Sequence, residues 1–246
     1  FCIVRSSSNR VLKKRRSLLM SLLLMALLLV GINPAFLSDT PQVVPNPTDV
    51  LSDVDGSGEL ASDVLERLEV KGRAPKTGYK RAEYGDGWAN IGDCDLRNIM
   101  LKRAITAPKI AEDNCVVLSG ELQDPYTGKT INFVRGSSTS ADVQIDHVVA
   151  LSDSWQKGAQ GLSYETRVKF ANDPLNLLAV DGPVNQEKGD SDSASWLPPN
   201  KAFRCQYVAR QIAVKSKYNL WVTEAEKSAM KRVLNGCREQ VVPYEK

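Results

Sequence analysis

Histidine is almost absent from this sequence, and its cysteines lack the close spacing of a zinc site. The 246 residues include one histidine, His147, and five cysteines, none of which forms a C-x-x-C pair. Tetrahedral zinc sites are commonly built from such cysteine pairs together with histidines. A structural zinc site is therefore not expected, and any histidine chemistry depends on His147.

An excess of positive charge is also missing once the first 37 residues are set aside. The formal net charge is +3, but residues 1–37 hold six Lys and Arg residues and no acid. The rest of the chain has 26 basic and 29 acidic residues, a balance of −3. A globally basic surface cannot serve nucleic-acid binding here, so any such site must use local positive charge.

Residues 1–37 have the layout of an export signal. A basic cluster at residues 13–16 precedes an uncharged apolar run of 15 residues, 18–32. The run is short for a membrane span, although residues 17–37 would just cross a bilayer if they were retained. No clear small-x-small cleavage site follows, so a cleaved signal peptide and a retained membrane anchor both stay open, with a buried core helix as the minor alternative. We expect a secreted or extracytoplasmic protein.

The four cysteines after the apolar run predict two disulfides, because an even set of cysteines is typical of exported chains. Four cysteines permit three pairings. We favour Cys94–Cys115 and Cys205–Cys237, since each pair lies within one local unit of the sequence. Cys2 precedes the apolar run and would face the cytoplasm or be removed.

Residues 38–59 form a predicted linker that is rich in Pro, Asp, Ser and Asn. Its last part, within DVDGSGEL (residues 53–60), resembles the start of an EF-hand calcium loop, with Gly58 where that loop turns. The twelfth position of such a loop needs a bidentate acid, and here it is Val64. A polar linker that leads into a helix is the better interpretation.

Residues 60–246 predict one α+β domain. Helical spacing of apolar residues marks 60–70 and 95–104, and two β-prone runs, 115–118 and 131–134, flank the turn-rich DPYTGK as a predicted hairpin. Further along we expect strands at 143–151 and 175–180, one or two helices within 152–171, a helix from about Val184, and helices at 200–218 and 223–237, the last with a capping-box pattern at Thr223 and Glu226.

Residues 143–198 gather the side chains that carry chemistry. VQIDHVVAL (143–151) contains Asp146 and His147, FANDPLNLLAV (170–180) contains Asn176, and NQEKGD (185–190) begins with Asn185. A histidine, a carboxylate and amide oxygens are the groups needed to activate water beside a hard metal ion. A lone histidine at a strand end is most often structural, but this ordered set favours a catalytic one.

The same set resembles the HNH endonuclease superfamily, whose core is the ββα-metal motif. The match is closest to exported bacterial proteins related to the C-terminal domain of GmrSD-type restriction enzymes. It rests on IDHVVAL, FANDPLNLLAV, NQEKGD and WLPPN, and more loosely on GRAPKTGY, GWAN, CDLRN and DPYTG, so it covers most of residues 70–237. The second asparagine, nine residues after the first, is part of what makes the pattern specific.

The resemblance implies a role for each residue. His147 would be the general base that takes a proton from water, and Asp146 and Asn185 would bind one Mg²⁺ or Mn²⁺, since their oxygens are hard ligands. Asn176 would brace the loop and help to hold the histidine. Adjacent strand residues point to opposite faces, so Asp146 and His147 can share a site only where the strand bends or ends.

Four basic residues are weaker candidates for holding a nucleic-acid backbone. They are Lys188, Arg167, Arg97 and Lys201. Each is as readily explained as a solvated or ion-paired side chain, and Lys188 has Asp190 as a nearby partner in the sequence. Trp155 and Trp196 are interpreted as core residues rather than base-stacking surfaces.

We therefore predict an exported, metal-dependent endonuclease that acts as a monomer on nucleic acid, DNA rather than RNA. The alternative from another class is a catalytically silent binding or cell-surface protein that keeps the HNH fold. A nuclease directed against competitors or host cells is a third possibility, which the sequence does not separate from the first.

Overall fold

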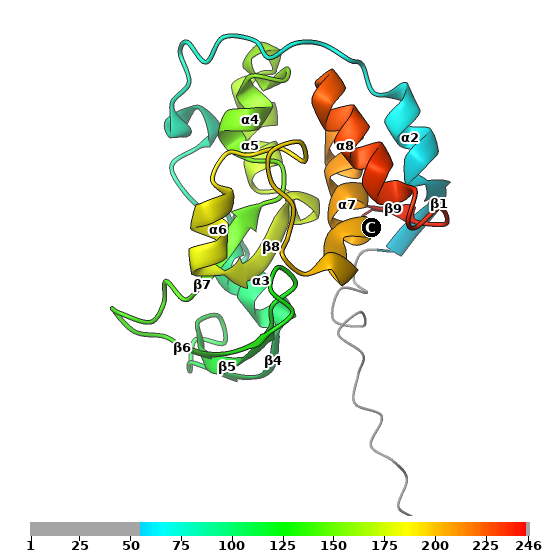
Figure 1. Ribbon diagram of the computed structural model, residues 1–246. Helices are drawn as coiled ribbons and strands as arrows, with labels where there is room; N and C mark the ends of the chain where they lie inside the picture. Colours follow the sequence, from blue (N-terminus) through cyan, green and yellow to red (C-terminus); the bar gives the residue numbers. More distant parts are fainter. Residues whose placement is uncertain (1–54, 245–246) are drawn as a thin grey trace, which may run out of the picture. The chain divides into compact units, whose positions relative to one another are not determined.

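The computed structural model describes residues 55–244 (Figure 1). The predicted export signal, the alternative membrane anchor at residues 17–37 and most of the predicted linker lie outside these residues. Within the described range, none of the helices is both long enough and apolar enough to span a membrane. The mixture of helices and small sheets confirms the predicted α+β class.

The folded part begins earlier than residue 60. Strand β1 (Asp55–Leu60) pairs antiparallel with β9 (Val241–Tyr244), so the end of the predicted linker belongs to a two-stranded sheet. Helix α2 (Ala61–Arg67) follows directly and confirms the helix predicted from apolar spacing. Its buried residues Val64 and Leu65 face the main core.

A three-stranded sheet fills the region that was predicted as a hairpin. Strands β5 (Val117–Gln123) and β6 (Thr130–Val134) form that hairpin, and β4 (Ile105–Ile110) adds a third strand that the sequence did not predict. The strands β4 and β5 come very close at Gly120, where a Cβ atom would lie 2.9 Å from the carbonyl oxygen of Thr106. The close approach requires a glycine at this position.

Helix α3 (Leu96–Ala104) lies between this sheet and the next one, as Figure 1 shows. Asp95 begins the helix by accepting a hydrogen bond from the backbone nitrogen of Asn98 at 2.7 Å. The short strands β2 (Asn90–Ile91) and β3 (Cys94–Asp95) precede it, and a one-turn 3₁₀ helix, η3 (Arg81–Tyr84), comes before them.

The central unit is a strand–strand–helix arrangement. Strand β7 (Val143–His147) pairs antiparallel with β8 (Leu177–Asp181), and α6 (Gly182–Lys188) follows β8 without a break. Asp181 caps α6 by accepting from the backbone nitrogen of Val184 at 2.9 Å. Between the strands lie α4 (Leu151–Trp155), η4 (Ala159–Gly161), α5 (Tyr164–Ala171) and η5 (Pro174–Asn176). The first predicted strand therefore ends four residues early, because the chain leaves the sheet after His147.

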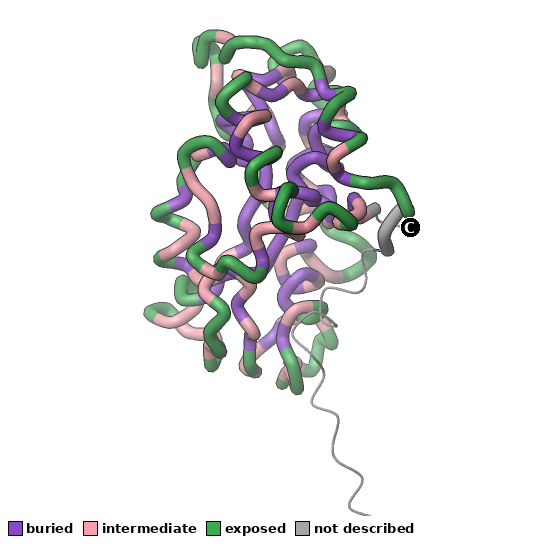
Figure 2. The backbone as a smooth tube through the Cα atoms, turned by 45° about the vertical axis from the view of Figure 1, so that its right-hand side comes forward, coloured by how far each residue is buried: buried purple, intermediate pink, exposed green. Residues whose placement is uncertain are grey.

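Two helices close the domain. After η6 (Lys201–Phe203) come α7 (Arg204–Lys217) and α8 (Glu224–Leu234), and the capping box at Thr223 and Glu226 is confirmed. Helix α7 runs through the main core, and Figure 2 shows buried residues gathered on the inner sides of the helices. Both predicted disulfides are present: Cys94–Cys115 ties β3 to the start of β5, and Cys205–Cys237 joins α7 to the end of α8.

Candidate active site

His147 ends β7, and two neighbours fix its ring. Its Nε2 lies 2.8 Å from the carbonyl oxygen of Ala171, and the indole of Trp88 stacks on it with centroids 5.6 Å apart. A carbonyl oxygen can only accept, so Nε2 carries the ring hydrogen and Nδ1 keeps its lone pair. Within residues 55–244, Nδ1 has no hydrogen-bond partner. The arrangement therefore selects the tautomer in which Nδ1 can accept a proton.

Burial also keeps this histidine neutral. The side chain is 8% exposed, and burial lowers the pKa of His147 to about 4, against the opposing hydrogen bond to Ala171. The positive charges of Arg81 and Lys188 lower the pKa further. At neutral pH the imidazole is therefore unprotonated at Nδ1.

Asn176 holds the loop that follows His147. Its Oδ1 accepts from the backbone nitrogen of Val149 at 2.8 Å, and its Nδ2 donates to the carbonyl oxygen of the same residue at 3.3 Å. Its own carbonyl accepts from the backbone nitrogen of Val148 at 2.8 Å. The side chain is fully buried. Asn176 thus braces the backbone directly after β7, at Val148 and Val149.

Asp146 points away from His147 and is held by two other side chains. Its Oδ1 accepts from Nζ of Lys188 at 2.9 Å, and its Oδ2 accepts from the hydroxyl of Tyr126. Lys188 also donates to the carbonyl oxygen of His147 at 2.9 Å. Burial raises the pKa of Asp146, although Lys188 and Tyr126 oppose this shift. The strand therefore does not bring the carboxylate and the imidazole into contact.

Asn185 lies on the same side of β7 as Asp146. It is half-buried on α6, and its Nδ2 donates to Oε1 of Gln144 at 2.9 Å. Gln144 and Asp146 are two residues apart on β7 and so share one face of the strand. Asn185 and Lys188 are three residues apart on α6 and share one side of the helix. Across the β7–α6 contact, Asn185 therefore meets Gln144 and Asp146 meets Lys188, so both predicted metal ligands belong to this one contact.

The donor atoms at this contact suit a hard cation. Carboxylate and amide oxygens are the ligands that Mg²⁺ and Mn²⁺ prefer, and the Oδ1 of Asn185 has no partner within the described part of the chain. The Oδ1 of Asp146, however, already pairs with Lys188. No group of three or more His, Cys, Asp or Glu side chains in residues 55–244 is arranged so that it could hold a metal ion. A cation here would have two protein ligands, and Lys188 would have to move aside.

Three of the four basic candidates are not on an open surface. Arg167 is buried, where its guanidinium donates to Glu83 and to the carbonyl of Leu162. Arg97 donates to the carbonyl oxygens of Ser140, which precedes β7, and of Val143, its first residue, and burial lowers the pKa of Arg97. Lys188 is buried against Asp146 and not paired with Asp190, which instead binds Lys76. These three hold the fold together, and Lys201 alone is exposed.

Three residues of the site had no assigned role in the sequence analysis. They are Tyr126, which bonds Asp146, Trp88, which covers His147, and Gln144, which bonds Asn185. The first two lie in DPYTG and GWAN, stretches that contributed to the family resemblance. A role for Gln144 could have been inferred from its place two residues before Asp146 on a strand.

Comparison with known proteins identifies the family. A model of the C-terminal domain of GmrSD restriction endonucleases matches residues 96–233. A protein of Arthroderma benhamiae described as an uncharacterized secreted protein is 39% identical over 201 residues, which cover 80% of this chain and 92% of the relative. No solved structure matches the chain. This chain therefore belongs to the family of GmrSD restriction endonuclease C-terminal domains.

Proposed function

We propose that this protein is an exported endonuclease that hydrolyses phosphodiester bonds of nucleic acid, DNA in preference to RNA, with His147 as general base. The observation that carries the proposal is the fixed tautomer of His147, whose Nε2 faces the carbonyl of Ala171 and whose Nδ1 has no hydrogen-bond partner among the described residues. The family match supports nuclease chemistry. The name of the secreted relative, together with the export-like residues 1–37, supports export.

The protein's own residues would act in a simple order. His147 takes a proton on Nδ1 from a water molecule, whose oxygen forms a bond to phosphorus while the bond from phosphorus to the leaving oxygen breaks. Solvent supplies a proton to the leaving oxygen, and His147 then releases the proton on Nδ1 to solvent. Trp88 and the carbonyl of Ala171 hold the imidazole in one orientation, and Asn176 fixes the loop behind it. Such positioning removes the need to order the base during the reaction.

The cofactor we propose is one divalent cation, Mg²⁺ or Mn²⁺, with Asp146 and Asn185 as its protein ligands. A cation bound there would supply charge to neutralise the phosphoryl oxygens. Waters and substrate oxygens would complete its shell, as is common for Mg²⁺. Binding requires that Lys188 release Oδ1 of Asp146.

One observation favours the alternative, a silent binding protein with the same fold. Both oxygens of Asp146 are already engaged, by Lys188 and by Tyr126. A carboxylate held in this way needs no metal ion for its stability. If Lys188 does not release it, the site has a histidine but no cation.

Plasmid cleavage separates the two functions. The purified, oxidised protein is incubated with supercoiled DNA, and in parallel with RNA, in Mg²⁺, in Mn²⁺ and in EDTA. We expect metal-dependent cleavage that is lost in a folded His147→Ala variant and kept in a Lys109→Ala control, which alters an exposed residue of β4. A folded protein that cleaves neither substrate with either metal would be a binding protein.

A further inference from the structure

An open pocket of about 650 Å³ lies against α7 and α8, and none of the candidate active-site residues lines it. Its walls are the 193–197 segment, the beginning of α7 and one side of α8. Three basic residues line it, Lys201, Arg204 and Arg232, and no acidic residue does. Positive charge is therefore concentrated here, although the chain beyond residue 37 is slightly acidic.

In the described part of the chain, the three cations of the pocket have no acidic partners. Within residues 55–244, neither Lys201 nor Arg232 forms an ion pair, and both are exposed. Among the described residues, the side chain of Arg204 bonds only from Nε to the carbonyl oxygen of Pro198 at 2.8 Å, so its terminal nitrogens stay available. By contrast, the buried cation Lys157 contacts several carboxylates. Cations without acids around a hollow suit a ligand with several negative charges.

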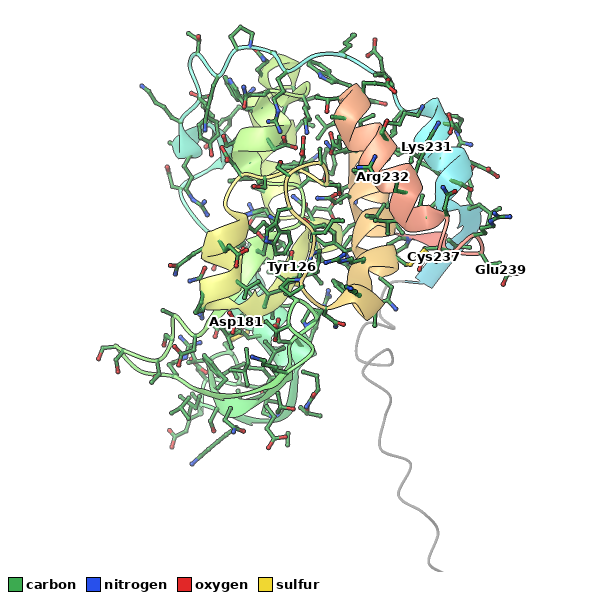
Figure 3. All side chains as sticks on the ribbon, viewed as in Figure 1. Tyr126, Asp181, Lys231, Arg232, Cys237 and Glu239 are labelled. Atoms are coloured by element: carbon green, nitrogen blue, oxygen red, sulfur yellow. A yellow bond between two sulfur atoms is a disulfide. The ribbon has the colours of Figure 1, made fainter. Side chains whose placement is uncertain are left out.

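The pocket is held rigidly. Cys205 lines it directly after Arg204, and its disulfide to Cys237 joins α7 to the end of α8, the helix that carries Arg232. Figure 3 labels Arg232 and Cys237 on this part of the molecule. Because the disulfide ties the two helices, the spacing of their cations is set before any ligand arrives.

The pocket also connects to the candidate active site through aromatic rings. Trp196, which lines the pocket, meets the ring of Tyr126 edge to face with centroids 5.1 Å apart. The hydroxyl of Tyr126 in turn bonds Asp146. Trp196 and then Tyr126 therefore link the basic pocket to the predicted metal ligand Asp146.

We propose that this pocket binds phosphate groups of the nucleic-acid backbone, on a part of the substrate flanking the bond that is cleaved. The inference rests on the proposed nuclease function. Arginine forks bind phosphate oxygens in pairs, and lysine adds a mobile positive charge. Such contacts fix the substrate without reading its sequence.

Salt dependence of binding tests the proposal. A labelled DNA duplex is titrated in EDTA with the His147→Ala protein, with the same protein carrying Lys201→Gln, Arg204→Gln and Arg232→Gln, and with a control carrying Lys109→Gln, Lys129→Gln and Lys169→Gln. The control removes the same charge from exposed residues outside the pocket. Three lost phosphate contacts should reduce the slope of log affinity against log salt by about 2.7. When salt is raised from 50 to 200 mM, affinity falls by some factor in each protein. That factor should be about 40 times smaller for the pocket variant than for its parent.

A second variant guards against misfolding. Replacing Lys201 and Arg232 alone keeps the bond between Arg204 and Pro198, and the slope should still fall by about 1.8. Slopes for this variant that equal those of the control, or no binding of DNA or RNA by the parent protein, would overturn the proposal. If the wild type cleaves nucleic acid but the slopes of the pocket variants are unchanged, the pocket proposal is wrong and the nuclease proposal stands. If the slopes of the pocket variants are reduced but the wild type cleaves nothing, the pocket proposal is confirmed and the nuclease proposal is wrong.

Discussion

Replacing Lys157 with methionine should destabilise the protein strongly, because this lysine is fully buried among acids. Its Nζ lies 2.7 Å from carboxylate oxygens of Asp153, Asp192 and Glu226. Methionine has a similar length but no charge, so the change leaves buried carboxylates with fewer partners. Removing one member of a buried ion pair typically costs about 3–5 kcal/mol. Lys215 still contacts Glu226 at 3.0 Å, so we expect a loss near the lower end, about 3 kcal/mol.

Urea unfolding of the oxidised protein at pH 7 measures this loss. With a slope of about 2 kcal/mol per molar urea, the midpoint should fall by about 1.5 M. Lys109→Met, at an exposed site on β4, should change stability by less than about 0.5 kcal/mol. A Lys157→Met variant within about 1 kcal/mol of the wild type would refute the idea that this cluster stabilises the fold.

The loss of folding stability at low pH gives an independent check on the same cluster of Lys157 and its acids. Burial alone would raise the pKa of Asp192, but Lys157 and its other partners hold it well below the usual value. A carboxyl with a depressed pKa contributes stability above its unfolded pKa and loses it as the pH falls. Wild-type stability should therefore decrease below about pH 4. Lys157→Met should show a shallower decrease, because less of that stability remains to be lost.

Three other predictions concern the candidate site. In a proton NMR titration in EDTA, the signal of the single histidine should shift with a midpoint near pH 4, because burial lowers the pKa of His147 to about 4. A midpoint of about pH 6.5 would mean that the ring is exposed. Asn176→Ala leaves the backbone nitrogen of Val149 unpaired, so thermal unfolding should show a loss of about 1–3 kcal/mol, accompanied by weaker cleavage. In Lys188→Met, Mg²⁺ should raise the melting temperature more than in the wild type, because the Oδ1 of Asp146 no longer has its ammonium partner. Equal effects of Mg²⁺ on the two melting temperatures would argue against a metal ion at Asp146.

The elements of the central unit were predictable because local signals agree with the fold there. The strands predicted at 143–151 and 175–180 correspond to β7 and β8, and the helix predicted from about Val184 is α6, which begins at Gly182. The disulfide pairs were predictable from proximity along the chain.

The contacts of the charged residues were not predictable, because they depend on distant segments. Lys188 meets Asp146 from 42 residues away, and Arg167 meets Glu83 from 84 residues away. Strand β4 was missed since it contains Pro108, which disfavours a strand, and Ala107 takes a positive φ of 47°. Tertiary pairing with β5 outweighs these local preferences.

The most direct test of the account is chemical rescue of a His147→Gly variant. Loss of the ring leaves space beside Trp88 and the carbonyl of Ala171, where free imidazole can take its place. With DNA, Mg²⁺ and a series of imidazole concentrations, we predict no cleavage without imidazole and a saturable return of cleavage with it. Rescue should follow the neutral form of imidazole as the pH is raised. Undiminished cleavage by the variant without imidazole would contradict the assignment of His147 as the general base.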